Sequence, residues 1–135
     1  MPPKFGNDNM LKFNEMGFKP NLLKGLDELG FVNPTPIQEQ VIPIFFETES
    51  DIVGLAQTGT GKTAAFGLPI IEQIDIENKS VQALILSPTR ELCIQISKDL
   101  QNYSKHVKGI EIVSVYGGAS IETQMRALKK GAHII

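Results

Sequence analysis

The sequence predicts an α/β fold in which an open, mostly parallel sheet carries helices on both faces. Two observations support this fold class. Short apolar runs at 52–55, 81–86, 110–115 and 132–135 have the length of buried strands. Longer segments with apolar residues at helical spacing separate these runs. Because strand and helix alternate, the strands are expected to pair in parallel through right-handed crossovers.

Two short helices are expected before the first strand. Pro20 suits the first turn of a helix whose apolar positions recur at helical spacing, namely Leu22, Leu23, Leu26 and Leu29. Thr35 and Pro36 begin a second helix, which we expect to stop or kink near Pro43. Residues 1 to about 12 are polar and rich in Pro and Gly, so they are expected to form a flexible arm.

Three further helices are expected to alternate with the strands. The first follows the glycine-containing loop at 56–63. The third runs from about Ser120 to Lys130, just before a glycine that suits its C-terminus. The second is amphipathic and presents one apolar face, formed by Leu92, Ile96, Leu100 and Tyr103.

Length and composition indicate one ordinary globular domain or a piece of one, because 135 residues with 41% hydrophobic side chains can enclose a single core. Thirteen basic against fifteen acidic residues give a net charge of −2, which excludes a basic surface over the whole domain. One cysteine, Cys93, excludes an internal disulfide. The first ten residues also contain no apolar run that could serve as a secretion signal, so we expect a cytoplasmic protein. No stretch approaches the ~20 apolar residues that cross a bilayer, so we expect no membrane contact.

The two histidines and the cysteine are not expected to carry chemistry. His106 and His133 lack Cys or carboxylate partners at metal-ligand spacing, so surface or packing roles are expected and no structural metal. Cys93 lies among apolar residues of a predicted helix, which favours an inert thiol over a nucleophile.

The loop after the first strand fits a phosphate-binding pattern, with Ala in place of its first Gly. Gly59 and Gly61 permit a tight turn with N–H groups directed at an anion, and the next helix adds its positive N-terminus. Lys62 can reach the β- and γ-phosphates and the Thr63 hydroxyl can ligate Mg²⁺, so these two are the candidate catalytic residues. The alternative is a turn that only joins strand to helix. The full loop is Ala56, Gln57, Thr58, Gly59, Thr60, Gly61, Lys62 and Thr63.

Four stretches in this order resemble the motifs of the DEAD-box family of ATP-dependent RNA helicases. They are GFVNPTPIQ at 30–38, AQTGTGKT at 56–63, PTRELC at 88–93 and the pair Gly117-Gly118. The resemblance covers 13–135 and implies the N-terminal portion of the first RecA-like domain, which has a P-loop NTPase fold. Small departures at Val32, Asn33 and Cys93 touch no side chain that the chemistry requires.

The resemblance implies an adenine site upstream of the loop. Gln38 would read the base edge with support from Thr35, and Phe13 would stack on the base, with Phe31 in the same cofactor-binding set. Two alternatives stay open. The residues Thr35-x-x-Gln38 also form a capping-box pattern at a helix start, and Phe13 could instead be a core aromatic.

The resemblance also implies RNA contacts at two later motifs. Pro88, Thr89 and Arg90 precede or begin a helix, where N–H groups and a cation could bind an RNA phosphate. Gly117 and Gly118 follow the third strand, where small residues let a sugar-phosphate backbone approach. The alternatives are a surface ion pair between Arg90 and the next residue, Glu91, and a plain turn at the two glycines.

In this family, further motifs would follow residue 135, including the Asp-Glu-Ala-Asp tetrad and the second RecA-like domain. These are missing here, so we expect a C-terminally truncated fragment that binds ATP and Mg²⁺, binds RNA weakly and does not hydrolyse ATP alone. The parent would unwind or remodel short RNA duplexes. Two other interpretations share residues 56–63: a P-loop kinase or other small-molecule NTPase, and a nucleotide-sensing module that binds a protein partner without turnover.

Overall fold

The computed structural model describes residues 11–135. In this part of the chain the helices occur in the order η1 (Phe13–Glu15), α1 (Pro20–Glu28), α2 (Pro36–Glu47), α3 (Lys62–Gln73), α4 (Arg90–Tyr103) and α5 (Ile121–Lys129), where η1 is a single 3-10 turn. The helices predicted from apolar spacing are thus confirmed. The arm predicted for 1–12 lies outside the described residues except at its last two positions.

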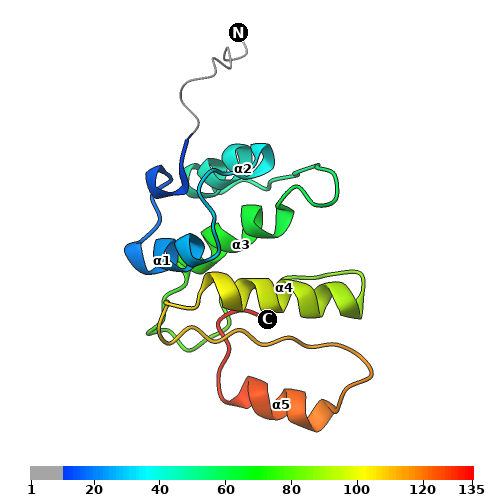
Figure 1. Cartoon of the computed structure of the whole chain (residues 1–135). Coiled ribbons are helices and arrows are strands. Elements are labelled where there is room, and N and C mark those ends of the chain that lie inside the picture. The colour runs from blue at the N-terminus through cyan, green and yellow to red at the C-terminus, as the bar shows by residue number, and fades with distance from the viewer. Residues whose placement is uncertain (1–10) are drawn as a thin grey trace.

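Three of the four predicted strands lie side by side in parallel. Residues 132–135 take the central place, and parallel bridges join Ile134 to Ala83 on one side and to Ile112 on the other. Backbone hydrogen bonds of 2.8 to 3.1 Å run along the Ala83 side. Figure 1 shows the segment that follows α4 (yellow to orange) and the C-terminal segment (red) between α4 and α5, with one of these helices on each side. The predicted parallel pairing is confirmed for these three segments.

The remaining predicted strand, 52–55, has no bridge to any other part of 11–135. Val53 and Leu55 are 87% and 89% exposed, although they were expected in a buried strand. Strand geometry needs a neighbour that pairs with its N–H and C=O groups, and no described segment supplies one at this position. The segment therefore runs as an extended connection into the loop that precedes α3.

Helix α2 continues past the proline that was expected to stop or kink it. Pro43 lies inside the helix, which reaches Glu47, and Thr48 N donates to Ile44 O at 3.1 Å beyond the end. A proline removes one donor from the helix interior, but packing compensates here, because α2 contacts α3 and buries Val41 and Ile42. The helix therefore does not stop at Pro43, and a kink there stays a prediction.

The core lies where α1, α3 and α4 meet and extends to the central strand. Gly25 of α1 lies so close to the end of α4 that a Cβ atom there would be 2.6 Å from Tyr103 O. Gly67 of α3 likewise lies against Leu100, with 2.5 Å between a built Cβ and Leu100 Cδ2. The core comprises Phe13, Phe18, Leu22, Leu26, Ile42, Ala64, Leu68, Ile71, Ile74, Ile96, Leu100, Tyr103 and Ile134. Among residues 11–135, no helix has the length and apolar character that a membrane span requires.

Candidate functional site

The loop before α3 has the tight turn that the sequence predicts. Gly59 and Gly61 have φ values of +80° and +81°, in the left-handed region that costs other residues roughly 1–2 kcal/mol. Gly61 is also the N-cap of α3, so the first N–H groups of the helix face the loop. A helix N-terminus behind such a turn favours an anion.

Within the loop, two polar side chains donate hydrogen bonds to main-chain carbonyls. Lys62 Nζ donates to Ala56 O at 2.8 Å, so the ammonium group spans the loop from its penultimate residue to its first. Thr60 Oγ1 donates to Gln57 O at 2.6 Å. Lys62 is exposed, and an anion seated in the loop could replace the carbonyl oxygen as the partner of its charge.

Hydrogen bonds tie the start of α2 to this loop. Thr35 Oγ1 donates to Thr60 O at 2.7 Å, and Gln38 Nε2 donates to Gly61 O at 3.1 Å. Gln38 Oε1 accepts from Thr35 N at 2.9 Å, as part of a capping box at the start of α2. Gln38 is 3% exposed. The capping-box interpretation is therefore confirmed, and the same two side chains also hold the phosphate loop.

A pocket of about 300 Å³ lies on the other side of Gln38. Phe13 forms part of its wall although it is only 3% exposed, because its ring stacks on Phe31 with centroids 5.8 Å apart and planes 28° apart. The core-aromatic interpretation of Phe13 is thus confirmed, and one ring face already has a partner. The pocket is lined by Phe13, Gly30, Phe31, Val32, Asn33, Thr35 and Gln38, which brings together the residues expected at an adenine site.

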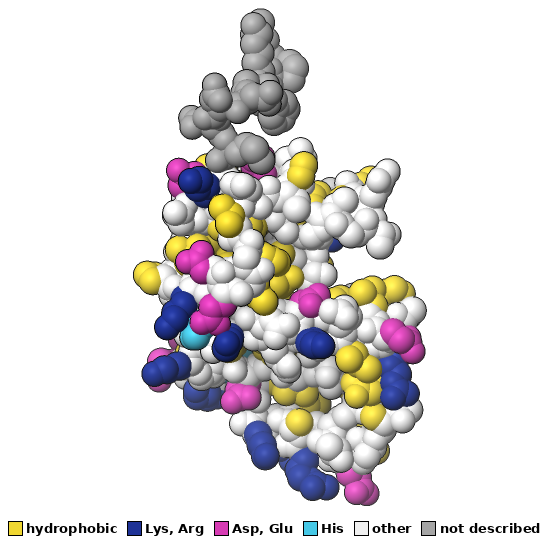
Figure 2. Space-filling model, viewed as in Figure 1, with side chains coloured by type: hydrophobic (Ala, Val, Ile, Leu, Met, Phe, Trp, Pro, Cys, Tyr) yellow, Lys and Arg dark blue, Asp and Glu magenta, His cyan; other side chains and the backbone are white. Residues whose placement is uncertain are grey.

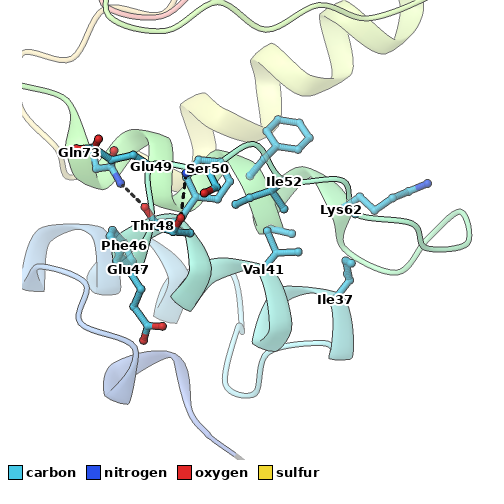
Figure 3. A pocket seen from close by; sticks show the side chains of 14 residues that line it. Ile37, Val41, Phe46, Glu47, Thr48, Glu49, Ser50, Ile52, Lys62 and Gln73 are labelled. Carbon is cyan, nitrogen blue, oxygen red and sulfur yellow. Dashed lines mark hydrogen bonds between the residues drawn. The ribbon is translucent and has the colours of Figure 1, made fainter.

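A larger pocket of about 920 Å³ lies between α2, α3 and the connection at 48–54. Figure 3 shows Ile37, Val41 and Ile52 on its apolar wall, while the Lys62 side chain at one end points away from that wall. Glu47 also lines this pocket. Apolar groups do not solvate a phosphate and acidic groups repel it. This pocket is therefore a poorer anion site than the loop.

The PTRELC motif at 88–93 caps α4 and lies beside the loop at 56–63. Thr89 Oγ1 accepts from Leu92 N at 3.2 Å, so Thr89 is the N-cap, and Arg90 is the first residue of the helix. A cavity of about 450 Å³ is lined by Lys62 and Thr63 on one side and by Ser87 and Leu92 on the other. The start of α4 and the loop at 56–63 therefore border one cavity at the carboxyl end of 81–86, which is where ligands of open α/β sheets bind.

The glycine pair at 117–118 lies close to the PTRELC motif, which it approaches at Arg90. The Arg90 guanidinium carbon lies 5.1 Å from the centroid of the Tyr116 ring, directly before the glycine pair. Gly118 has a φ of +83°, and a Cβ atom there would be 2.9 Å from Arg90 Nη1. Within 11–135 Arg90 forms no ion pair with a carboxylate, so the alternative of an Arg90–Glu91 surface pair was wrong. Gly117 and Gly118 do form a turn.

Two residues of this cluster were missed by the sequence interpretation. The Tyr116 ring packs against the Arg90 guanidinium. The Gln124 side chain on α5 hydrogen-bonds both the N–H and the C=O of Tyr116, at 3.0 and 2.9 Å. The available signal was an aromatic residue immediately before the glycine pair. On the face in Figure 2, Lys and Arg side chains are scattered among acidic ones and do not form a continuous patch. Any anion contact is accordingly local.

Outside the candidate site, both histidines have the surface and packing roles expected. His106 Nε2 lies 2.7 Å from Glu28 Oε1, and Lys105 Nζ lies 2.9 Å from the other Glu28 oxygen. These hydrogen bonds lower the pKa of Glu28. His133 is buried and its Nδ1 accepts from Glu111 N at 2.9 Å. Cys93 is half-buried, with its sulfur 3.7 Å from Val115 O.

The model of the DEAD/DEAH box helicase family matches residues 35–135, which is most of the chain. The chain belongs to this family. A curated relative, the DEAD-box ATP-dependent RNA helicase CshA of Streptococcus pneumoniae, is 51% identical over 125 residues. That match covers 93% of the chain but 24% of the relative. The chain therefore spans about a quarter of the length of this DEAD-box relative.

Solved DEAD-box structures confirm the fold class. A DEAD box protein from Methanococcus jannaschii superposes with a TM-score of 0.85 at 40% identity, covering 92% of this chain and 34% of that protein. Saccharomyces cerevisiae Dbp5 bound to RNA and ADP BeF3 superposes with a TM-score of 0.75 at 32% identity, covering 92% and 31%. The open α/β fold predicted from the sequence, with its RecA-like arrangement, is thus confirmed for this DEAD-box chain.

Proposed function

We propose that this chain binds ATP with Mg²⁺ and supplies part of the RNA-binding surface of a cytoplasmic, ATP-dependent RNA helicase that remodels short RNA duplexes. The supporting observation is the pair of hydrogen bonds from Thr35 and Gln38 to Thr60 and Gly61. Thr35 and Gln38 also line the pocket of about 300 Å³, so these bonds join that pocket to the loop at 56–63, which supports one nucleotide site formed by both. In this proposal residues 13–135 form the N-terminal portion of a first RecA-like domain.

The proposed nucleotide contacts divide between the loop and the pocket. The N–H groups of 58–63 would hold the phosphates, Lys62 would leave Ala56 O for the β- and γ-phosphates, and the Thr63 hydroxyl would ligate Mg²⁺. Gln38 would contribute its remaining donor and acceptor positions to adenine, since an amide has two of each and the described bonds use one of each. Phe13 would form the wall against which the base packs.

The proposed RNA contacts lie at the start of α4 and at the glycine turn. Pro88 and Thr89 would bring helix N–H groups to a phosphate, and Arg90 would supply the charge. Gly117 and Gly118 would allow the sugar-phosphate backbone to approach the chain. The net charge of −2 and the scattered basic side chains support weak binding with a shallow dependence on salt.

The nucleotide proposal is tested by calorimetric titration of ATP with Mg²⁺ into the chain and into Lys62→Ala. We expect binding to be lost in Lys62→Ala with an unchanged circular dichroism spectrum, because the exposed lysine contributes charge and not packing. Lys98→Ala is the matched control, since Lys98 is an exposed residue of α4 away from the loop. Undiminished ATP binding by Lys62→Ala would refute the proposed site.

The helicase proposal is tested by measuring ATP turnover with and without single-stranded RNA, in the chain and in any longer protein that contains these residues. Stimulation by RNA is expected for a helicase. A P-loop kinase or other small-molecule NTPase would share the loop at 56–63 but would not respond to RNA. Turnover that RNA leaves unchanged would therefore favour that second class of enzyme.

A further inference from the structure

The Gln124 side chain hydrogen-bonds the main chain of Tyr116, which directly follows the extended segment 110–115. Its Oε1 accepts from Tyr116 N at 3.0 Å and its Nε2 donates to Tyr116 O at 2.9 Å. Both main-chain groups of Tyr116 are thereby satisfied by one side chain, as a neighbouring strand would satisfy them. This pair fixes the backbone of Tyr116 immediately before the turn at Gly117 and Gly118.

The Tyr116 ring in turn supports the Arg90 guanidinium. The guanidinium carbon lies 5.1 Å from the ring centroid, a distance at which a cation is attracted to the ring face. On another side, Arg90 Nη1 packs against Gly118, where a Cβ atom would approach to 2.9 Å. Arg90 is exposed and pairs with no carboxylate in the described part of the chain. Its planar set of donors is held in place but remains free for an anion.

We infer that Gln124 is a positioning residue for RNA binding, acting through Tyr116 to set where Arg90 meets a phosphate. This inference rests on the proposed RNA contact of Arg90. A long side chain that is already ordered loses less conformational freedom when it binds, which strengthens binding without a new contact. It also gives α5 a role, since this helix has no buried residue of its own.

The first test compares the affinities of variants for a fluorescein-labelled, single-stranded RNA at low salt, measured by anisotropy. Gln124→Met keeps the length of the side chain and removes both hydrogen bonds, so affinity should fall about three- to tenfold. Gln95→Met is the matched control, because within residues 11–135 the Gln95 amide bonds only Asp99 on the same helix, at 2.9 Å. The control should bind as the unmodified chain does.

A double variant separates positioning from a general loss of structure. If Gln124 acts through Arg90, then Gln124→Met combined with Arg90→Gln should bind no more weakly than Arg90→Gln alone. Tyr116→Phe, which keeps the ring face, should retain the affinity, whereas Tyr116→Leu should lose it to the same extent as Gln124→Met. These two variants keep the test decisive if Gln124→Met is poorly folded by circular dichroism.

A second readout needs no RNA. The chain has two tyrosines and no tryptophan, so Tyr103→Phe leaves Tyr116 as its one tyrosine and hence as its dominant fluorophore. In that background, acrylamide should quench Tyr116 more strongly after either Gln124→Met or Arg90→Gln, because the guanidinium no longer covers the ring. Gln95→Met should leave the quenching unchanged.

The possible outcomes distinguish the positioning role of Gln124 from the proposed RNA contact of Arg90. If the unmodified chain binds RNA and Gln124→Met binds equally well, or if its effect adds fully to that of Arg90→Gln, the inference is overturned and RNA binding stands. If neither the unmodified chain nor Arg90→Gln binds RNA at low salt, the proposed RNA contact fails and the inference fails with it. Reduced affinity, no added loss in the double variant and increased quenching together support the inference.

Discussion

The Gln38 side-chain amide donates to the main-chain carbonyl of Gly61 at 3.1 Å, which joins the start of α2 to the start of α3. The approach is so close that a Cβ atom on Gly61 would collide with Gln38 Nε2. Gly61 is therefore required twice, once for its positive φ and once for the space that Gln38 occupies. If a base bound at Gln38 moved this side chain, the hydrogen bond to Gly61 O would transmit the movement to the loop at 56–63.

Substituting the two loop glycines separates these requirements. Gly59→Ala introduces only the strain of a positive φ, since nothing lies within 4 Å of a Cβ there. Gly61→Ala adds a clash with Gln38 to the same strain. We expect Gly59→Ala to lower the free energy of unfolding by roughly 1–2 kcal/mol, and Gly61→Ala to lower it by more and to weaken ATP binding further. Urea denaturation and ATP titration check this; equal losses would contradict the role given to the Gln38 contact.

Base choice tests the proposed use of Gln38. Guanine presents an acceptor where adenine presents its amino donor, and such a buried mismatch costs about 1–3 kcal/mol. ATP should therefore bind roughly tenfold to a hundredfold more tightly than GTP, and Gln38→Ala should remove that preference. Competition between the two nucleotides for the loop measures it.

The control for Gln38→Ala is Gln38→Glu. Glu keeps an oxygen to accept from Thr35 N and loses the donor to Gly61 O, so it should retain the helix start but also lose the preference for ATP. Equal affinity of the unmodified chain for ATP and GTP would leave Gln38 with its capping bond and its bond to Gly61 O, and with no role in reading the base.

Local patterns predicted the elements well because their causes are local. The apolar spacing of α1 and α4, the capping residues Thr35 and Thr89, and the glycines of the phosphate loop all act within a few residues. The continuation of α2 past Pro43 was not predictable in this way, since it depends on packing against α3. The same limit applies to 52–55, whose strand character depends on a distant partner.

Within the candidate site, sequence alone predicted the motifs but not what joins them. Gln124 and Tyr116 are eight residues apart, and no helical or strand period brings that spacing together. The chain reverses direction at Gly117 and Gly118, and that reversal places α5 against the end of the strand. Contacts across a turn of this kind depend on the direction in which the next helix leaves, which composition does not specify.

The packing of α1 on α4 predicts an unusual sign for Gly25→Ala. Alanine in a helix interior normally stabilises by about 1 kcal/mol relative to glycine. At Gly25 the added methyl would meet Tyr103 O at 2.6 Å, and a main-chain oxygen cannot move aside without shifting α4. We expect Gly25→Ala to lower the thermal midpoint, whereas Lys24→Ala, one residue earlier on the exposed side, should leave it nearly unchanged. A higher midpoint for Gly25→Ala would show that the two helices can separate freely.

Tyr103 should make stability fall at alkaline pH. Burial, with a smaller effect of the Asp99 charge, raises the pKa of Tyr103 from its ordinary value of 10.0 to about 12. Below pH 10 the phenol is neutral in both folded and unfolded chains, so its contribution to stability is fully present. As pH rises from about 10 to 12 the unfolded chain releases the proton first, and that contribution is lost. The loss cannot exceed roughly 2–3 kcal/mol.

Tyr103→Phe is the decisive comparison for this alkaline loss, because lysines also titrate in the same range in both proteins. Phe fills the same space at the contact with Phe31, whose ring centroid lies 5.7 Å from that of Tyr103. Urea unfolding should therefore show a smaller fall in the free energy of unfolding between pH 9 and 12 for Tyr103→Phe than for the unmodified chain. In a Tyr116→Phe background, phenolate absorbance should rise only near the pH at which the chain unfolds. Parallel curves for the two proteins, with early phenolate absorbance, would mean that water reaches the Tyr103 hydroxyl in the folded state and that burial does not hold its proton.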